Sequence, residues 1–529
     1  MQPRVSSGAL ADHEQEVSAP LPLREPADRW WRRALFALLL GTLLSRLPFL
    51  STVPFNGDSV HYLLAMEKFD PAQARPHPPG YPLYVLSGKA ARLVVGDPHQ
   101  ALVLLSVLAS VVAVWGVVRL GAVMGGPAVG LWAGVLLAVN PMFWLHGELA
   151  LPYAIEAAGA VLVALAAWES YTRPCTRGAV WLALTVAVAG GFRPTMLTLL
   201  APVFLFGLLR LGWRNRALAL GVAGLVVLTW LVPLVVLSGG VGTYLELARR
   251  QGEIAGGKTA LLSGAVDGWV ENFGLFLTTL LAAIHLVLLV ALVALVRRRP
   301  RRISARAVML WLWVAPAALT FALVHFGQIG YILLVVPPLL LLSLFAVAGA
   351  WPDVVASRRP APVLVTCVIV SLVLSWAGLA RLHDNEAAWR MVRAELATRP
   401  PAETVVLARV SEGGSFQTAV WVLREYRVVG LTGSESAARG ALYEARGGDW
   451  SYRVDKEAIA CRLVPLDGAR RVAVLDELLV GWVPDRAEWK SVALQGGAPL
   501  LLRDVPPGAN VVDLSRGTIQ LVAGDAAGC

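Results

Sequence analysis

The sequence predicts a mainly α-helical, polytopic membrane protein with a small extracytoplasmic α/β domain at its C-terminal end. Its 529 residues are 57% hydrophobic and only 16% charged, whereas soluble domains carry about 25% charged residues. Long apolar runs alternate with short polar loops up to about residue 380, and the later runs shrink to strand length. The net charge of +10 does not indicate nucleic-acid binding, because much of the excess lies in loops between apolar runs, as at 297–302.

The N-terminal segment, residues 1–29, is polar and rich in Pro, Glu and Arg, which predicts a disordered cytoplasmic tail. No small-residue cleavage site follows the first apolar run, so the segment does not have the pattern of a signal peptide. Arginines directly before that run favour a cytoplasmic N-terminus. They are Arg24, Arg29, Arg32 and Arg33.

Residues 30–380 predict a membrane domain of about eleven spans, because a bilayer core requires about 20 predominantly apolar residues per helix. The predicted spans are 34–50, 99–123, 127–144, 153–170, 178–192, 195–210, 217–238, 272–296, 307–325, 330–350 and 362–380. Alternation from an inside N-terminus places the Arg-rich loops on the cytoplasmic side. These loops are 173–177, 210–216, 297–306 and 358–359, and the outer loops are 51–98, 145–152, 239–271 and 326–329.

Residues 381–529 predict a small α/β domain on the outer face. A helical pattern at 385–398 precedes short apolar runs that are separated by Gly, Asp and Pro turns. The four cysteines form no CxxC pair, which argues against a zinc site built on thiolates. If this domain is exported, Cys461 and Cys529 are a candidate disulfide.

The polar insert between the first two predicted spans is the main candidate site. Asp58 follows a glycine near the outer interface, where a carboxylate can act as a general base or bind a metal. It can also cap a helix that begins at Val60 and includes His61, and the two roles can coexist. Three prolines around one glycine stiffen the turn that presents His77 and Tyr81, although a purely structural elbow would give the same pattern.

Other ionisable and aromatic side chains fall on the same predicted membrane face. His146 and Glu148 lie in the next outer loop, and Tyr153 and Glu156 begin the span that follows it. An acid at the depth of Glu156 is costly, so it either faces a protein cavity or reaches back to the interface. Arg193 stands between two apolar runs and either snorkels to lipid headgroups or holds a phosphate.

Two more outer segments complete this face. The last outer hairpin contributes Gln328 and Tyr331, which could close a pocket together with Asp58 and Arg193. The loop at 239–271 carries a helical pattern of mixed charge. It predicts either a lid over the site or a solvated helix face.

The motifs GDS at 57–59 and HPPGYPLY at 77–84 resemble a bacterial branch of the GT-C membrane glycosyltransferases. This superfamily includes the protein O-mannosyltransferases and the aminoarabinose transferases. The specific similarity continues through 106–110 and 140–144 to Tyr153 and covers roughly residues 35–200. The later spans match only in general pattern, and the C-terminal domain resembles no family that we can name.

The sequence departs from that branch at two places. Leu151 stands where relatives carry a glutamate, so Glu148 or Glu156 would have to supply the second acid. Gly330 stands where relatives often carry an arginine, so phosphate binding would rest on Arg193.

The resemblance implies inverting transfer of a sugar from a polyprenyl-phosphate donor to a glycan, lipid or protein acceptor at the outer face of a bacterial inner membrane. Asp58 would deprotonate or orient the acceptor hydroxyl, and Arg193, alone or together with His77, would stabilise the departing phosphate. Many members use a divalent cation near the first acid, so a cation at Asp58 is a further expectation. The remaining candidates would line the substrate site: His61, His77, Tyr81, His146, Glu148, Tyr153, Glu156, Gln328 and Tyr331.

Two other functions stay open at this point. A transporter or flippase of a lipid-linked sugar would bury charges near the bilayer midplane, whereas the ionisable residues here gather on one face, which favours an enzyme. A non-catalytic envelope assembly protein could use the outer domain for docking.

Overall fold

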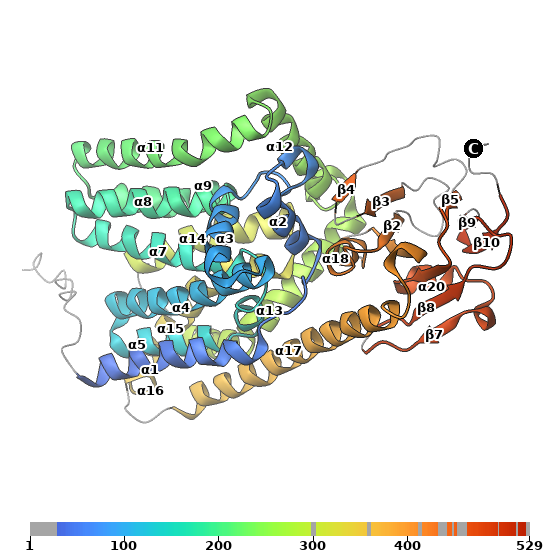
Figure 1. Ribbon diagram of the computed structural model, residues 1–529. Helices are drawn as coiled ribbons and strands as arrows, with labels where there is room; N and C mark the ends of the chain where they lie inside the picture. Colours follow the sequence, from blue (N-terminus) through green and yellow to red (C-terminus); the bar gives the residue numbers. More distant parts are fainter. Residues whose placement is uncertain are drawn as a thin grey trace, which may run out of the picture.

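A bundle of long helices forms one end of the molecule, and a domain with two β-sheets forms the other (Figure 1). The computed structural model describes residues 29–297, 303–356, 361–410, 415–431, 442–446, 449–451, 463–495, 497–514 and 517–524. This architecture confirms the predicted fold class. The predicted tail lies outside the described residues except for its last one, and the candidate disulfide partners Cys461 and Cys529 also lie outside them.

The bundle helices follow the predicted spans in position. They are α1 (Arg29–Arg46), α4 (Pro98–Gly125), α5 (Pro127–Ala138), α7 (Tyr153–Thr172), α8 (Thr176–Phe192), α9 (Thr195–Leu199), α10 (Ala201–Leu208), α11 (Trp213–Leu237), α13 (Val266–Arg297), α14 (Ala305–Leu323), α15 (Val336–Ala350) and α17 (Pro362–Leu396). Within the described residues, six helices are long and apolar enough to cross a membrane, namely α4, α7, α11, α13, α14 and α17. The chain is a multi-pass membrane protein, and the number of eleven spans stays a prediction.

Two predicted spans are divided into shorter helices at prolines. The third predicted span is split between α5 and α6 (Pro141–His146), because the Asn140 side chain accepts hydrogen bonds from two backbone N–H groups and caps a new helix. Pro141 then occupies the first turn, where its missing N–H costs nothing. The sixth predicted span is also divided, into α9 and α10, with Pro202 in the first turn of α10, but no side chain caps this helix.

The polar insert forms α2 (Gly57–Glu67) and α3 (Pro82–Val95) at the end of the bundle that faces the C-terminal domain (Figure 1). α3 is a 14-residue helix that buries Tyr84 and Val85 and exposes Leu93 and Val94. A short helix with one buried and one exposed apolar side is suited to lie at the membrane interface, and its 14 residues are fewer than a bilayer-spanning helix needs.

The predicted lid loop contains α12 (Val241–Gly256), whose charged side chains mainly pair with one another. Arg249 bonds both Glu246 and Glu253 on the exposed surface, as expected for a solvated helix face. The helix also reaches the insert, because the Tyr244 hydroxyl donates a hydrogen bond to the Pro79 carbonyl at 3.1 Å. α12 therefore contacts the insert through one tyrosine.

The C-terminal domain has a seven-stranded sheet with the order β4-β3-β2-β1-β6-β8-β7 and a three-stranded sheet with the order β10-β9-β5. The strands are β1 (Thr404–Arg409), β2 (Arg427–Leu431), β3 (Leu442–Arg446), β4 (Asp449–Ser451), β5 (Leu463–Pro465), β6 (Arg471–Val474), β7 (Lys490–Val492), β8 (Leu500–Asp504), β9 (Val511–Asp513) and β10 (Gln520–Val522). Strands β2, β1 and β6 are parallel, and the outer strands of the larger sheet are antiparallel. The predicted α/β domain is therefore built around a short parallel core.

The two faces of the larger sheet have different covers, because successive side chains of a strand point to opposite faces. Val406 and Ala408 of β1 pack in one cluster with α17 and α18 (Ser415–Val422). Val405 and Leu407 pack on the other side with α20 (Glu477–Gly481) and the smaller sheet. Each face thus has its own apolar core.

One helix joins the two parts of the molecule. α17 runs unbroken from the bundle into the C-terminal domain, so the predicted span at 362–380 and the predicted helix at 385–398 are one element (Figure 1). Leu364 packs in the core of the bundle, whereas Val392 and Leu396 pack beneath the larger sheet. A continuous helix with an apolar contact at each end fixes the C-terminal domain relative to the bundle.

The C-terminal domain also rests directly on the polar insert. Arg424, which follows α18, donates two hydrogen bonds to Glu67 at the end of α2, at 2.8 and 3.2 Å. Near the start of α2, a Cβ added to Gly57 would lie 3.3 Å from Cγ of Gln417. The helix that carries Asp58 therefore contacts α18 near its start and the residues after α18 at its end.

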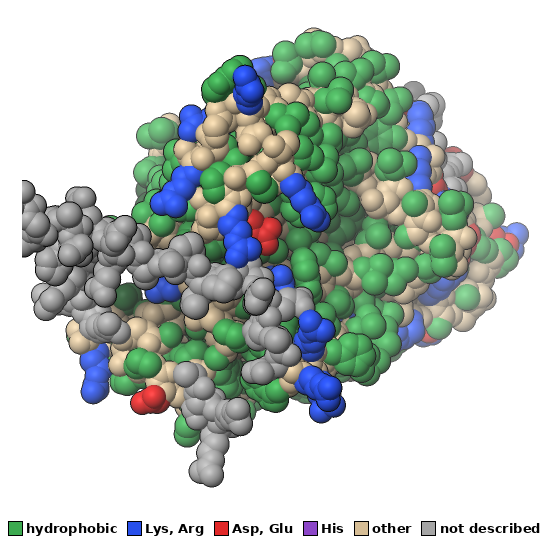
Figure 2. Space-filling view, turned by 90° about the vertical axis from the view of Figure 1, so that its left-hand side faces the viewer, with side chains coloured by type: hydrophobic (Ala, Val, Ile, Leu, Met, Phe, Trp, Pro, Cys, Tyr) green, Lys and Arg blue, Asp and Glu red, His purple; other side chains and the backbone are tan. Residues whose placement is uncertain are grey.

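The opposite end of the bundle is rich in basic side chains. Figure 2 shows Lys and Arg side chains spread over this face with few acidic ones. Arg119, Arg173 and Arg177 surround Glu169 there, in a hollow between the ends of α4, α7 and α8. This is the end that the distribution of arginines predicts to be cytoplasmic.

The contact between α2 and α18 can be tested with a cross-link. The Cβ positions of residues 57 and 417 lie 3.6 Å apart, within the range of about 3.5–4.5 Å that suits a disulfide. We expect Gly57→Cys combined with Gln417→Cys, in a chain whose native cysteines are replaced by alanine, to form that bond. A protease site inserted at 298–302 would then yield two fragments that stay joined until reduction.

The single variant Gly57→Cys is the control, and its fragments should separate without reductant. Fragments of the double variant that separate equally well under oxidising conditions would contradict the docking of α18 on α2.

Candidate active site

The Asp58 carboxylate lies at the start of α2 but does not cap this helix. The helix begins at Gly57, earlier than the predicted start at Val60. Asn56 caps it, because its side-chain oxygen accepts a hydrogen bond from the Ser59 N–H at 3.2 Å. The alternative that Asp58 is the N-cap is therefore wrong. Its carboxylate lies in the first turn, where the positive end of the helix dipole stabilises its charge.

Asn56 also ties the insert to the bundle. Its side-chain amide donates a hydrogen bond to the Gln328 side chain at 3.1 Å. Gln328 stands directly before the short 3₁₀ helix Ile329–Leu334 in the last predicted outer hairpin. One asparagine thus caps the helix of Asp58 and holds the hairpin of Tyr331 beside it.

The proline-rich turn places His77 next to Asp58. The Nδ1 atom of His77 lies 3.7 Å from Oδ1 of Asp58, which is too far for a hydrogen bond. Its Nε2 atom lies 3.2 Å from the Tyr81 hydroxyl. The peptide bonds before Pro76 and Pro79 are cis, and Gly80 adopts a φ of +84°, which favours glycine.

Aromatic rings fix His77 from the other side. The ring centroids of His61 and Tyr62 lie 5.9 and 5.6 Å from that of His77. His61 is itself held by a hydrogen bond between its Nδ1 atom and the Ala74 carbonyl at 2.7 Å. The imidazole of His77 is therefore positioned by packing, and no hydrogen bond to its Nδ1 atom forms within the described residues.

The electrostatics of this cluster favour a basic carboxylate beside neutral imidazoles. Burial raises the pKa of Asp58 above its ordinary 3.8, and the interactions with His61 in its protonated form and with Arg193 act in the opposite direction. Burial and, to a smaller extent, the charge of Arg193 lower the pKa of His77 to about 4. Burial also lowers the pKa of His61 to about 4. At neutral pH both imidazoles are uncharged, and Asp58 is a stronger base than an ordinary aspartate.

Arg193 faces the same cluster from the end of α8. Its Nη1 atom donates a hydrogen bond to Oε2 of Glu156 at 2.9 Å, and its guanidinium lies 4.3 Å from the centre of the Tyr331 ring. Glu156 is 4% exposed, so its carboxylate lies in the protein interior and does not reach back to the interface. The Nε atom of Arg193 has no hydrogen-bond partner among the described residues, so the guanidinium retains donors for a ligand.

Tyr153 and His146 extend this side of the site. The ring of Tyr153 lies edge-on to His146 and to Tyr331, with centroid distances of 5.2 and 5.6 Å. A Cβ added to Gly330 would lie 2.1 Å from the Tyr153 ring. The position at which relatives often carry an arginine therefore has no room for a side chain here while Tyr153 keeps its place.

Glu148 lies apart from this cluster. Its carboxylate is buried beside the side chains of Trp144 and Arg46. Burial raises the pKa of Glu148 to about 9, and the charge of Arg46 opposes this shift. Of the two acids that could replace the relatives' glutamate, Glu156 is therefore the one that contacts Arg193.

The described residues do not make up a cation site by themselves. They contain no group of three or more His, Cys, Asp and Glu side chains that could hold a metal ion. Divalent cations such as Ca²⁺ and Mg²⁺ prefer several oxygen ligands, whereas the groups described around Asp58 include the imidazoles of His61 and His77 and the guanidinium of Arg193. The expectation of a divalent cation stays a prediction, and no step below depends on one.

The structure thus brings most predicted site residues to one place. They are Asp58, His61, His77 and Tyr81 on the insert, and Tyr153, Glu156, Arg193, Gln328 and Tyr331 on the bundle, with His146 behind Tyr153. Sequence reasoning gave no role to Asn56 or Tyr62. The signal for Asn56 was present, because asparagine is a favoured N-cap and stands directly before Gly-Asp.

Comparison with known proteins places the fold. No protein-family model matches the sequence, and no curated protein matches it significantly. Among solved structures, ArnT from Cupriavidus metallidurans bound to undecaprenyl phosphate superposes with a TM-score of 0.58 at 13% identity, over 90% of this chain and 98% of that one. ArnT from the same organism in the apo state gives 0.54 at 13% identity, with the same coverage of both chains. The resemblance to GT-C membrane glycosyltransferases is therefore confirmed at the level of the fold.

The buried pair of Arg193 and Glu156 generates a stability prediction. We expect Arg193→Met to destabilise the protein by about 3–5 kcal/mol, because it leaves a buried carboxylate without its partner. The double variant Arg193→Met with Glu156→Leu should recover most of that loss. Arg250→Ala, which breaks an exposed pair with Glu246, is the control and should change stability by less than about 1 kcal/mol.

Unfolding of the purified protein in detergent measures these differences. A single Arg193→Met variant as stable as the wild type would contradict the structural role of the pair.

Proposed function

We propose that this chain is a membrane glycosyltransferase that moves a sugar from a polyprenyl-phosphate donor to an acceptor hydroxyl on the outer face of the membrane. One observation carries the proposal. The carboxylate of Asp58 does not cap its helix, and it lies close enough to the guanidinium of Arg193 for their charges to interact. The similarity of this fold to that of ArnT, which was crystallised with undecaprenyl phosphate, supports a lipid phosphate as the donor.

Asp58 acts as the general base in this reaction. Its carboxylate takes the proton of the acceptor hydroxyl while that oxygen forms a bond to the anomeric carbon. The bond between the anomeric carbon and the phosphate oxygen breaks, and its electron pair leaves with the phosphate. Because attack and departure occur on opposite sides of the carbon, the sugar configuration is inverted.

Arg193 stabilises the leaving group. Charge accumulates on the lipid phosphate in the transition state, and a preorganised guanidinium offers donors to it at little reorganisation cost. Glu156 keeps Arg193 in place through the hydrogen bond at 2.9 Å. His77 is neutral at working pH, so it positions Tyr81 and borders Asp58 without repelling or protonating the acceptor.

The position of the site suits a lipid-linked donor. The polyprenyl chain stays in the bilayer, so its phosphate is reached only at the interface. The proposed site lies at the end of the bundle that carries α3 and the C-terminal domain, whereas the arginine-rich hollow lies at the other end (Figures 1 and 2). By the distribution of arginines, the site and the C-terminal domain face outward from a bacterial inner membrane.

Replacement of the base tests the proposal. We expect Asp58→Asn to lower kcat for sugar transfer from undecaprenyl-phosphate sugars by about 10²–10⁴-fold, the usual contribution of a general base. Asp267→Asn, which changes another acid in the first turn of a helix, is the matched control and should keep wild-type activity. Full activity of Asp58→Asn would remove Asp58 from catalysis. No transfer by the wild type from hexose and pentose donors would favour a transporter or an assembly protein.

The pH dependence follows from the raised pKa of Asp58. The base must be ionised, so kcat/KM should fall as the pH drops through that pKa. Because burial raises this pKa above 3.8, the acid limb should lie at higher pH than for an ordinary aspartate. A profile measured on folded protein that stays level down to the ordinary aspartate pKa would contradict the assignment.

A further inference from the structure

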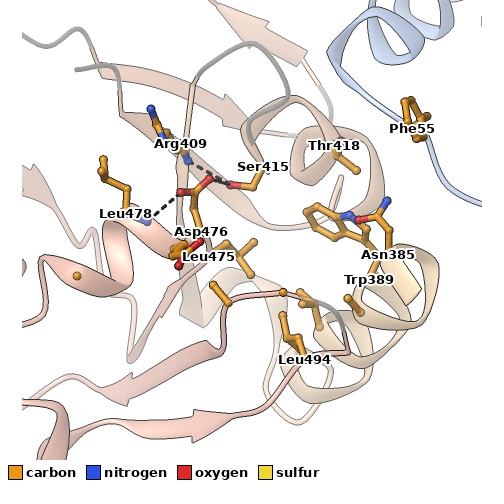
Figure 3. Close-up of a pocket in the computed structure, with 16 residues that line it drawn as sticks. Phe55, Asn385, Trp389, Arg409, Ser415, Thr418, Leu475, Asp476, Leu478 and Leu494 are labelled. Carbon is orange, nitrogen blue, oxygen red and sulfur yellow. Dashed lines mark hydrogen bonds between the residues drawn. The ribbon is translucent and has the colours of Figure 1, made fainter. Parts of the chain in front are cut away.

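A cavity of about 680 Å³ lies where the C-terminal domain meets the polar insert and α17. Its lining includes Phe55, which stands three residues before Asp58, and side chains from α17, α18 and the strand ends of the larger sheet (Figure 3). The volume falls within the range of about 300–1,000 Å³ that is typical of small-molecule sites. The reaction described above does not use this cavity.

The topology of the sheet favours a ligand at this place. β1 and β6 are adjacent and parallel, and each is followed by a short helix. α18 follows β1 and packs on one face of the sheet, whereas α20 follows β6 and packs on the other. The two chain paths therefore diverge at the carboxyl ends of these strands, where open α/β sheets leave a crevice that binds ligands.

The cavity has a polar wall and an aromatic wall (Figure 3). Arg409, Ser415 and Asp476 form the polar wall at the ends of β1 and β6. Trp389 and Asn385 project from neighbouring turns of α17 on the opposite side.

The polar wall includes a residue in a strained backbone conformation. Asp476 has a φ of +97°, in a region that non-glycine residues rarely occupy. Its carboxylate accepts hydrogen bonds from the Leu478 N–H at 3.2 Å and from the Ser415 hydroxyl at 3.4 Å. These bonds hold the acid at the end of β6, where it lines the cavity.

Several groups that line the cavity have unused hydrogen-bonding capacity. Within the described residues, no hydrogen bond or ion pair engages the guanidinium of Arg409, the amide of Asn385 or the indole N–H of Trp389. All three side chains are partly exposed. The site therefore offers hydrogen-bond donors and an amide oxygen beside an aromatic ring.

We propose that this cavity binds the saccharide portion of the acceptor, an inference that rests on the proposed transfer function. A sugar ring has C–H groups that pack on an indole face and hydroxyls that bond to planar amide, guanidinium and carboxylate groups. Trp389 supplies the first kind of contact, and Asn385, Arg409 and Asp476 supply the second. Phe55 connects the cavity to the insert, so a bound acceptor would extend from here toward Asp58.

Binding of simple glycosides tests the proposal without knowledge of the natural acceptor. Saturation-transfer NMR on the full-length protein in nanodiscs, with a panel of methyl hexosides, pentosides and N-acetylhexosaminides, should show at least one binder. We expect Asn385→Ala and Trp389→Leu to weaken that binder by about tenfold or more, which corresponds to about 1.4 kcal/mol. Asp384→Ala changes the adjacent residue, which bonds Gln495 and does not line the cavity, and should bind like the wild type.

Two variants are needed because Trp389 also packs against the domain core, whereas Asn385→Ala removes only the amide. The proposal is overturned if no glycoside binds the wild type, if both variants bind as the wild type does, or if only inorganic phosphate or a nucleotide competes for the site. The increase in the unfolding temperature of the protein on addition of undecaprenyl phosphate, measured on the same samples, should be unchanged in both variants. A wild type that binds glycosides here but not undecaprenyl phosphate would count against the transfer function and leave the saccharide site standing.

Discussion

The buried ion pair between Arg193 and Glu156 is the interaction on which the candidate site depends. A guanidinium at the end of a membrane helix is costly unless a partner offsets the loss of water. Glu156 supplies that partner through one hydrogen bond and leaves part of the guanidinium free. The aromatic ring of Tyr331 packs against the guanidinium of Arg193. The pair thus keeps a cation at the edge of the bundle, and this cation opposes the effect of burial on the pKa of Asp58.

The part of the site that contains Asp58 depends on the N-terminal cap of α2. Asn56 caps α2 by accepting a hydrogen bond from the Ser59 N–H, so the Asp58 carboxylate is not needed as a cap. Asn56 also donates a hydrogen bond to Gln328, which fixes this helix to the last outer hairpin. The C-terminal domain then packs on the same helix through α18 and is held to the bundle by α17. Asp58, Arg193 and the C-terminal domain are therefore held together by one set of contacts. In the proposed reaction this arrangement would present an acceptor, held by the domain, to a donor held by the bundle.

Much of the fold could be predicted from the sequence because the bilayer imposes length and composition on each span. The insert could be identified because polar residues and prolines between two spans are unusual. The division of the third span at Pro141 and the true start of α2 depend on hydrogen bonds of Asn140 and Asn56, which hydropathy does not record. The contact of Glu156 with Arg193, and the separation of Glu148 from both, depend on helix packing between segments far apart in sequence. The cavity beside β1 and β6 requires the order of the strands, which short apolar runs do not reveal.

The most direct test of the central claim is to determine where the lipid phosphate binds. A cryo-electron microscopy structure of the chain in nanodiscs with undecaprenyl phosphate should show phosphate density within hydrogen-bonding distance of the Arg193 guanidinium and on the side that faces Asp58. Phosphate density at any other position, with Arg193 bonded to Glu156 alone, would contradict the account.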